Sequence, residues 1–394
     1  IVAVLDGGVL GGGTLILDGP ITTDPMAYQV LGQLVVTSGN GAVLKPGMKV
    51  SGGGVPDQTT ITSLAGGALL TLSGAASVTE RTNLFSTIPG IENGINGILG
   101  GFATVGGTAF ASVVNGTIGV LADTNLLPAS SSSGTLNYYI NGGILAATGS
   151  LAVNSLTLRG GSGPGTLALG TYALAFTPNG GLLYAGTYGQ NYTITGSGLV
   201  SAGVGNELIL NIGSSNTLSI ANPLIGSSGA LTKAGGGTLR LTASNSYTGP
   251  TQVFAGNLIT TTASGLPDTS AIYVNDGAAL FLGGAENIGS LAGGGVVSAG
   301  SNQLTLGLNG FSTTFSGSLS TTGGLLKVGF GTETLTGASV IGGGVAVKNG
   351  VLAVANGWSL GSGTDTISVT GVATTGFAGG MLVVDGGAGG MNIP

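Results

Sequence analysis

Histidine and cysteine are both absent from this chain of 394 residues. Without histidine, the chain can form no Ser-His-Asp triad, no Cys-His pair and no histidine-ligated metal site. Without cysteine, it can form neither a disulfide framework nor a thiolate metal site. These absences exclude most hydrolase mechanisms. We therefore predict a protein that is not an enzyme, with no catalytic residue, no cofactor and no metal ligand.

Charged residues are scarce. They make up 6% of the chain, with eight Lys or Arg and 14 Asp or Glu, whereas 42% of residues are hydrophobic. So few basic residues argue against nucleic-acid binding, which depends on neutralising phosphates. A soluble monomer usually keeps roughly a quarter or more of its surface charged. This exterior must therefore consist of Thr, Ser, Asn and Gly or be hidden against other molecules, as expected for assembly or for life outside the cell.

Long uninterrupted hydrophobic runs are missing as well. The uncharged stretch between Glu92 and Asp123 is broken by Gly, Thr, Ser or Asn every few residues. A membrane helix needs about 20 dominantly apolar residues, so we predict strand–turn–strand here and no membrane span. The chain opens at Ile1 with no visible signal peptide. We therefore expect a processed chain or one part of a longer polypeptide.

Glycine, in contrast, is abundant, at 82 residues. Each glycine costs about 1 kcal/mol relative to alanine inside a helix, and the accompanying Thr, Val, Ser and Leu suit a pleated surface. Short alternating runs closed by Gly or Asn-Gly recur at irregular spacing, which is typical of a solenoid with loops of varying length. The predicted strands lie in 13–19, 33–39, 60–64, 69–74, 155–160, 166–170, 207–213, 216–222, 271–277, 303–308, 345–357, 366–371 and 381–387.

A row of β-sandwiches is the alternative all-β architecture. Aromatic residues are only 5% of the chain and Trp358 is its one tryptophan, which is little bulk for sandwich cores. A solenoid interior is instead filled by ladders of Leu, Val, Ile and Ala from successive turns. We therefore predict a β-solenoid, with roughly 15 to 20 turns stacked at the strand spacing of a sheet.

An internal repeat supports stacked units. Residues 229–258 and 323–352 align without a gap at an offset of 94, the separation of Lys233 and Lys327, and Tyr247 meets Ile341. We expect each of these pairs to occupy equivalent positions. In the first copy, the residues that meet their own kind are Leu231, Lys233, Gly235, Gly237, Thr238, Leu241, Thr242, Gly249, Val253, Gly256 and Leu258.

The first copy resembles the autotransporter-associated β-strand repeat, whose pattern is G-x-L-T-K-x-G-x-G-T-L-x-L, then N-x-Y-x-G-x-T-x-V, then G-x-L. The second copy departs from that pattern at Ser339, Ile341 and Val345. Residues 288–329 look like the linker that precedes such repeats, and residues 45–77 are similar to a small β module of bacterial surface proteins and phage fibres. The resemblance implies a right-handed parallel β-helix displayed outside the cell at a bacterial surface, and it identifies no ligand.

Three regions are expected. Residues 1–89 form an N-terminal β-rich module, residues 90–225 a solenoid with irregular turns, and residues 226–394 a solenoid that carries both repeats.

The acidic residues are scattered. A glycosidase needs two neighbouring carboxylates, which folding could supply from Asp268 and Asp276 or from Asp18 and Asp24. The simpler interpretation is that Asp-Gly pairs close turns. A carbohydrate-active β-helix enzyme is therefore kept as the second alternative.

The function predicted first is an extracellular structural one, a self-associating solenoid subunit of a bacterial surface fibre or layer. Open strand edges template further pairing, and both Ile1–Leu5 and Met381–Asp385 are apolar and strand-like. The expected partners are copies of the same chain, joined into an oligomer or filament through apolar surfaces and strand edges. The first alternative is a monomeric adhesin or passenger stalk, which should show a continuous Thr, Ser and Asn exterior.

Overall fold

The computed structural model describes residues 103–114, 117–122 and 125–354, with gaps at 162, 187–189, 203–206 and 227–228, and single residues and short strands elsewhere. Every regular element of this described part is a β-strand. The described residues include no helix long and apolar enough to cross a membrane. The fold is an all-β parallel solenoid, as the sequence predicts.

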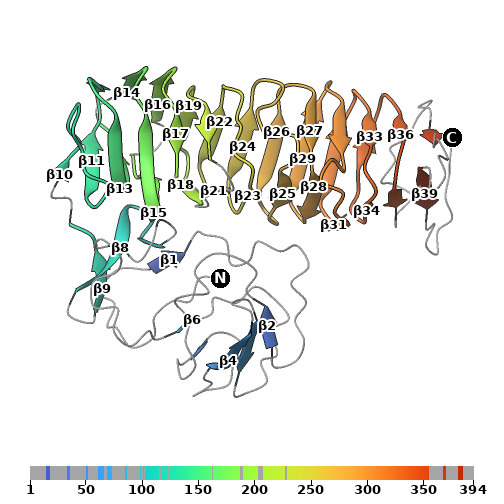
Figure 1. Cartoon of the computed structure of the whole chain (residues 1–394), viewed down its shortest axis with the longest axis horizontal. Coiled ribbons are helices and arrows are strands. Elements are labelled where there is room, and N and C mark those ends of the chain that lie inside the picture. Colours follow the sequence, from blue (N-terminus) through green and yellow to red (C-terminus); the bar gives the residue numbers. More distant parts are fainter. Residues whose placement is uncertain are drawn as a thin grey trace.

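The longest sheet, called here the long sheet, has 15 strands. Two of them lie off its main path: β17 (Val200–Ser201) pairs with β15, and β20 (Leu224–Ile225) pairs with β17. Figure 1 shows its strands following one another along the long axis of the molecule. In spatial order the others are β10 (Asn125–Leu126), β11 (Asn137–Asn141), β13 (Leu151–Arg159), β15 (Leu174–Tyr184), β18 (Leu208–Ile212), β21 (Leu231–Ala234), β23 (Thr251–Val253), β25 (Ala271–Val274), β28 (Ser290–Gly293), β31 (Thr313–Phe315), β34 (Thr332–Leu335), β37 (Val351–Val354) and β39 (Met381–Val384).

Two further parallel sheets form the other sides of the solenoid. The ten-stranded sheet contains β12 (Ile144–Ala146), β14 (Gly165–Gly170), β16 (Asn191–Gly196), β19 (Thr217–Ile220), β22 (Thr238–Leu241), β24 (Asn257–Thr260), β26 (Ala279–Leu282), β29 (Val296–Gly300), β32 (Ser318–Thr321) and β35 (Val340–Ile341). The five-stranded sheet contains β27 (Glu286–Ile288), β30 (Leu304–Leu306), β33 (Leu325–Lys327), β36 (Val345–Val347) and β38 (Ile367–Val369).

Successive strands visit the sheets in turn. From β27 onward, most turns place one strand in each sheet, so that β28, β29 and β30 pair with β31, β32 and β33 of the next turn. Before β27 the chain mostly alternates between the long and ten-stranded sheets, and the short strands β17 and β20 are added between them, off the main path of the long sheet. A turn takes about 20 residues, as in the pairing of Leu306 with Lys327. The solenoid has about ten turns, one for each strand of the ten-stranded sheet. The prediction of roughly 15 to 20 turns is therefore wrong.

Antiparallel strands precede the solenoid. β7 (Ala103–Val105), β8 (Ala109–Val114) and β9 (Thr117–Val120) pair in sequence and fall within the uncharged stretch for which strand–turn–strand is predicted. Phe110 and Ile98 pack against Leu183 of β15. The other antiparallel strands are β1 (Leu15–Leu17), which pairs with β7, then β2 (Gln33–Val35), β4 (Ile61–Ala65) and β5 (Leu69–Leu72), and the pair β3 (Val50–Ser51) and β6 (Phe85–Ser86).

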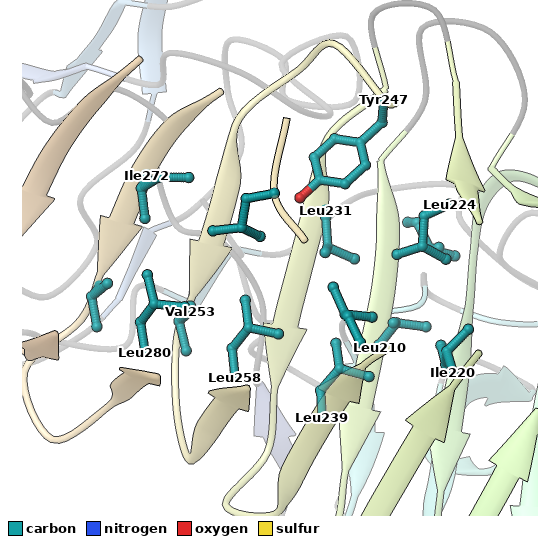
Figure 2. Packing of buried hydrophobic residues seen from close by; sticks show 14 of the residues in the cluster. Leu210, Ile220, Leu224, Leu231, Leu239, Tyr247, Val253, Leu258, Ile272 and Leu280 are labelled. Carbon is teal, nitrogen blue, oxygen red and sulfur yellow. The ribbon is translucent and has the colours of Figure 1, made fainter. Parts of the chain in front are cut away.

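The interior is filled by ladders of aliphatic side chains. Side chains alternate between the two faces of each strand, so one face of every strand points into the solenoid. Leu239, Leu258, Leu280, Val297 and Leu319 occupy matching positions on consecutive strands of the ten-stranded sheet, and all are fully buried. Figure 2 shows the first three of them in the interior. Each such side chain contributes about 1.5 to 3 kcal/mol when buried, and the predicted ladders are confirmed.

Each predicted strand run overlaps an observed strand, from β1 in 13–19 to β39 in 381–387. Trp358 and the runs Ile1–Leu5 and Asp385–Gly387 lie outside the described residues. The division at residues 89 and 225 stays a prediction.

Candidate functional site

The two repeats lie in the same solenoid but on different sides of it. β21 and β22 of the first copy belong to the long and ten-stranded sheets, whereas the matching β33 and β34 belong to the five-stranded and long sheets. The same displacement separates β23 and β24 from β36 and β37. An offset of 94 residues therefore falls one side short of a whole number of turns. The repeat specifies a pair of strands and the turn between them, not a particular side of the solenoid.

The structure explains why the repeat has a lysine at position 233. Its side chain lies inside the solenoid, level with Leu210 and Val253 on the neighbouring strands, and is fully buried. Its Nζ donates hydrogen bonds to the carbonyl oxygens of Ala234, Gly235 and Ala255, at 2.7, 2.6 and 2.9 Å. An ammonium has three N–H donors, so these three carbonyls suit a charged lysine at the end of its strand.

Lys327 repeats this arrangement on another side. It is 1% exposed, and its Nζ donates to the carbonyls of Val328, Gly329 and Asn349, at 2.6, 3.0 and 3.4 Å. Burial lowers the pKa of Lys327, while the negative charge of Glu333 acts in the opposite direction. The prediction that the two lysines are equivalent is confirmed.

Asn245 of the first copy joins three turns of the chain. Its Oδ1 accepts a hydrogen bond from the backbone N–H of Leu224, at 2.8 Å. Its Nδ2 donates to the carbonyls of Ala243, at 3.2 Å, and Gly265, at 2.6 Å. The side chain thus satisfies backbone groups of β20 and of the chain beyond β24, which gives a structural role to the Asn of the pattern.

Tyr247 forms a buried network of hydroxyls in the same turn. Its hydroxyl lies 2.6 Å from Thr251 Oγ1, which lies 2.9 Å from Ser270 Oγ, and Ser270 donates to the carbonyl of Gly249 at 2.9 Å. Figure 2 shows the ring of Tyr247 extending into the interior that also holds Leu231. In the second copy Ile341 and Val345 replace Tyr247 and Thr251, and both are buried. The second copy therefore fills the equivalent positions with apolar side chains.

The residues proposed for a glycosidase do not converge. Asp268 and Asp276 are exposed and flank β25 at opposite ends. A four-residue strand spans about 13 Å, whereas the paired carboxyl groups of glycosidases lie roughly 5 to 10 Å apart. Asp18 and Asp24 lie outside the described residues. In the described part of the chain, no three acidic side chains gather as a metal site would require.

Two buried carboxyl groups were not predicted from the sequence. Glu286 of β27 and Glu333 of β34 point into the solenoid, and each is 1% exposed. Burial raises the pKa of Glu286 to about 7 and that of Glu333 to about 8, from a usual value near 4.5. Strand alternation offered a signal, because Glu333 precedes the interior Leu335 by two residues and therefore shares its face.

The outer face of the ten-stranded sheet is mostly small and polar. One row of outward positions crosses all ten strands, and half of its members are Thr or Ser: Ile144, Thr166, Thr193, Ser219, Arg240, Ile259, Phe281, Ser298, Ser320 and Val340. The neighbouring row is Asn191, Thr217, Thr238, Asn257, Ala279, Val296 and Ser318. Arg240 is the one charged residue in these two rows, which supply hydroxyls and amides without converging on a reaction centre.

Comparison with known proteins agrees with this picture. The family model described as the passenger-associated-transport-repeat matches residues 231–259 and 325–354, which are the two repeats. The chain is also 37% identical over 147 residues to the "Adhesin BmaC autotransporter" of Brucella suis biovar 1 (strain 1330). That alignment covers 35% of this chain and 4% of the relative. No solved structure matches the chain. The repeats and the relative indicate a cell-surface or extracellular passenger.

Proposed function

We propose that this autotransporter passenger solenoid is a non-enzymatic stalk, which stays monomeric and serves a surface adhesin as a rigid spacer. The repeats, the fold and the adhesin relative support a passenger of this kind. They favour the stalk, which was the first alternative, over the self-associating fibre subunit that the sequence alone suggested. The chain spans 4% of the relative's length, so adhesion itself and any ligand belong to the proposal.

The outer face of the ten-stranded sheet is the observation that carries the stalk. Its row from Thr166 to Ser219 and the neighbouring row from Asn191 to Asn257 consist of hydroxyl and amide side chains. Such groups are satisfied by hydrogen bonds to water and need no protein partner to cover them. In the first row, Ser298 and Ser320 separate Phe281, which is 38% exposed, from Val340, which is 63% exposed, and Ile259 lies beside Phe281. Single exposed apolar residues are normal on monomers.

Sedimentation velocity of the full chain over a wide concentration range tests this proposal. A stalk remains an elongated monomer at every concentration and at high salt. A fibre subunit forms larger species as concentration rises, and high salt leaves them intact because apolar and backbone contacts hold them. That second outcome would restore the fibre hypothesis.

A substitution at the last described strand sharpens the test. Val383 of β39 is 43% exposed, whereas its neighbour Leu382 packs against the core. Val383→Lys therefore adds a charge at the strand edge without disturbing the interior, and it avoids the damage that Leu382→Glu would cause. The monomeric stalk predicts the same sedimentation for Val383→Lys and the unmodified chain. A fibre that grows through this edge would dissociate.

A further inference from the structure

Glu286 and Glu333 lie where a soluble protein rarely places a carboxyl group. Glu286 pairs across the five-stranded sheet with Leu304, and Glu333 lies between Thr313 and Leu352 of the long sheet. Leu304 and Leu352 are fully buried members of the core. Each glutamate thus replaces one member of an aliphatic ladder. Burying an ionised carboxylate is costly unless it is paired and hydrogen-bonded.

Both carboxyl groups have hydrogen-bond partners on one oxygen and none on the other. Oε1 of Glu286 accepts from the backbone N–H of Leu266 at 2.6 Å. Oε2 of Glu333 accepts from Thr313 Oγ1 at 2.8 Å and from the N–H of Leu291 at 3.4 Å. The second oxygens, Oε2 of Glu286 and Oε1 of Glu333, are buried and unpartnered. An ionised carboxylate would leave negative charge on an oxygen that receives no donor.

Among the described residues, no cation pairs with either group. Lys327 is the positive charge that acts on Glu333, but its Nζ donates its hydrogen bonds to the three backbone carbonyls described above and not to the carboxylate. Glu286 faces the negative charge of Asp268, and the hydroxyl of Tyr247 belongs to the same interior. The strands that flank both glutamates otherwise place uncharged side chains beside them. Protonation of the second oxygen is the simplest way to remove the buried charge.

We propose that Glu286 and Glu333 each take up a proton when the solenoid folds, so that mild acid stabilises the folded solenoid and alkali destabilises it. Folding and surrounding pH would then be coupled through two interior groups that touch no surface ligand. The proposal is independent of the stalk function, since it concerns stability alone.

The direction of the coupling follows from the pKa values. Both groups titrate near 4.5 when exposed, and at about 7 and about 8 when folded. The folded chain therefore binds more protons than the unfolded chain within that window. The free energy of unfolding is therefore greatest near the acid end of this pH window, falls as pH rises, and becomes constant above the pKa values of the folded chain. Burial also raises the pKa of Glu207, which adds to the same trend.

Denaturant unfolding of the full chain at several pH values between about 5 and about 8 tests the proposal. The unfolding equilibrium constant should rise with pH, by about tenfold per pH unit for each glutamate that loses a proton on unfolding. The double variant Glu286→Gln, Glu333→Gln should lose that part of the slope, because a glutamine does not titrate. Ser298→Gln, which places a glutamine on the outer face and removes no acid, should leave the slope unchanged. Equal slopes in the double variant and the unmodified chain overturn the proposal.

A second measurement needs no variant and holds even where a glutamine disturbs folding. Unfolding the unmodified chain in weakly buffered solution at about pH 6, with an indicator dye, counts the protons exchanged. Net release of protons is expected. No release, or net uptake, shows that both carboxylates are already ionised in the folded solenoid, and the proposal then fails.

Discussion

Lys233 and Lys327 each donate hydrogen bonds to three backbone carbonyls at equivalent positions, one, two and 22 residues after the lysine, although the two lysines lie on different sides of the solenoid. Each set of three carbonyls is called here a lysine cage. The first two carbonyls belong to the turn that ends the lysine's own strand, and the third belongs to the next level. The cage thus links adjacent levels of the stack, and it is independent of which sheet the strand joins.

Removing either lysine head group should destabilise the stack. Lys233→Met or Lys327→Met leaves buried carbonyls without a donor, and hydrogen bonds to charged groups contribute about 1.5 to 3 kcal/mol. Lys233 should cost more, because its longest contact is 2.9 Å against 3.4 Å for Lys327. Denaturant unfolding measures both. Lys348→Met, at an exposed position, is the control and should change stability by less than about 0.5 kcal/mol. Lysine variants as stable as this control would show that the cages are unimportant.

Much of this fold could be predicted from alternation and glycine alone. The short apolar runs indicate strands, and the gapless offset between Lys233 and Lys327 indicates equivalent units. Alternation cannot specify which sheet a strand joins, because that depends on loop length around each turn. For the same reason the displacement of the second repeat by one side was not predicted. The interior glutamates were missed because charged residues are ordinarily assigned to the surface, although the position of Glu333 relative to Leu335 placed it inside.

The hydroxyl network of Tyr247 should behave as one unit. Thr251→Val leaves the buried Tyr247 hydroxyl without its partner at 2.6 Å, which should cost about 1 to 3 kcal/mol. Tyr247→Phe should cost less, because Thr251 keeps its contact with Ser270. The double variant should lose less unfolding free energy than the sum of the losses in the two single variants, by about 0.5 kcal/mol or more. A double-mutant cycle by denaturant unfolding measures this coupling, and strict additivity would contradict it.

Gly249 and Gly343 should tolerate no side chain, each for its own reason. A Cβ at Gly249 would lie 2.5 Å from the carbonyl oxygen of Gly229, so backbone must move. At Gly343 the φ of 74° is already unfavourable for other residues, and a Cβ would lie 2.6 Å from the carbonyl oxygen of Thr322. Alanine at either position should cost about 2 kcal/mol or more. Thermal unfolding would show this against Gly163→Ala, where a Cβ meets nothing within 4 Å.

Adjacent residues of β29 should respond in opposite ways to a negative charge. Val297 is fully buried inside, whereas Ser298 is partly exposed in the outward row of the ten-stranded sheet. Val297→Asp should unfold the solenoid locally or globally, since it buries an unpaired charge. Ser298→Asp should change the free energy of unfolding by less than about 0.5 kcal/mol. Circular dichroism during denaturation compares the two variants.

The same outward variant also reports on the function. A stalk whose outer face meets only water should sediment as a monomer with Asp at position 298, as it does with Ser298. A fibre that buries this face between copies would bring the new charges of neighbouring copies together and would dissociate, because like charges opposed across an interface are unfavourable. A change in sedimentation caused by Ser298→Asp, with folding intact, would therefore identify this face as an interface and would count against the stalk.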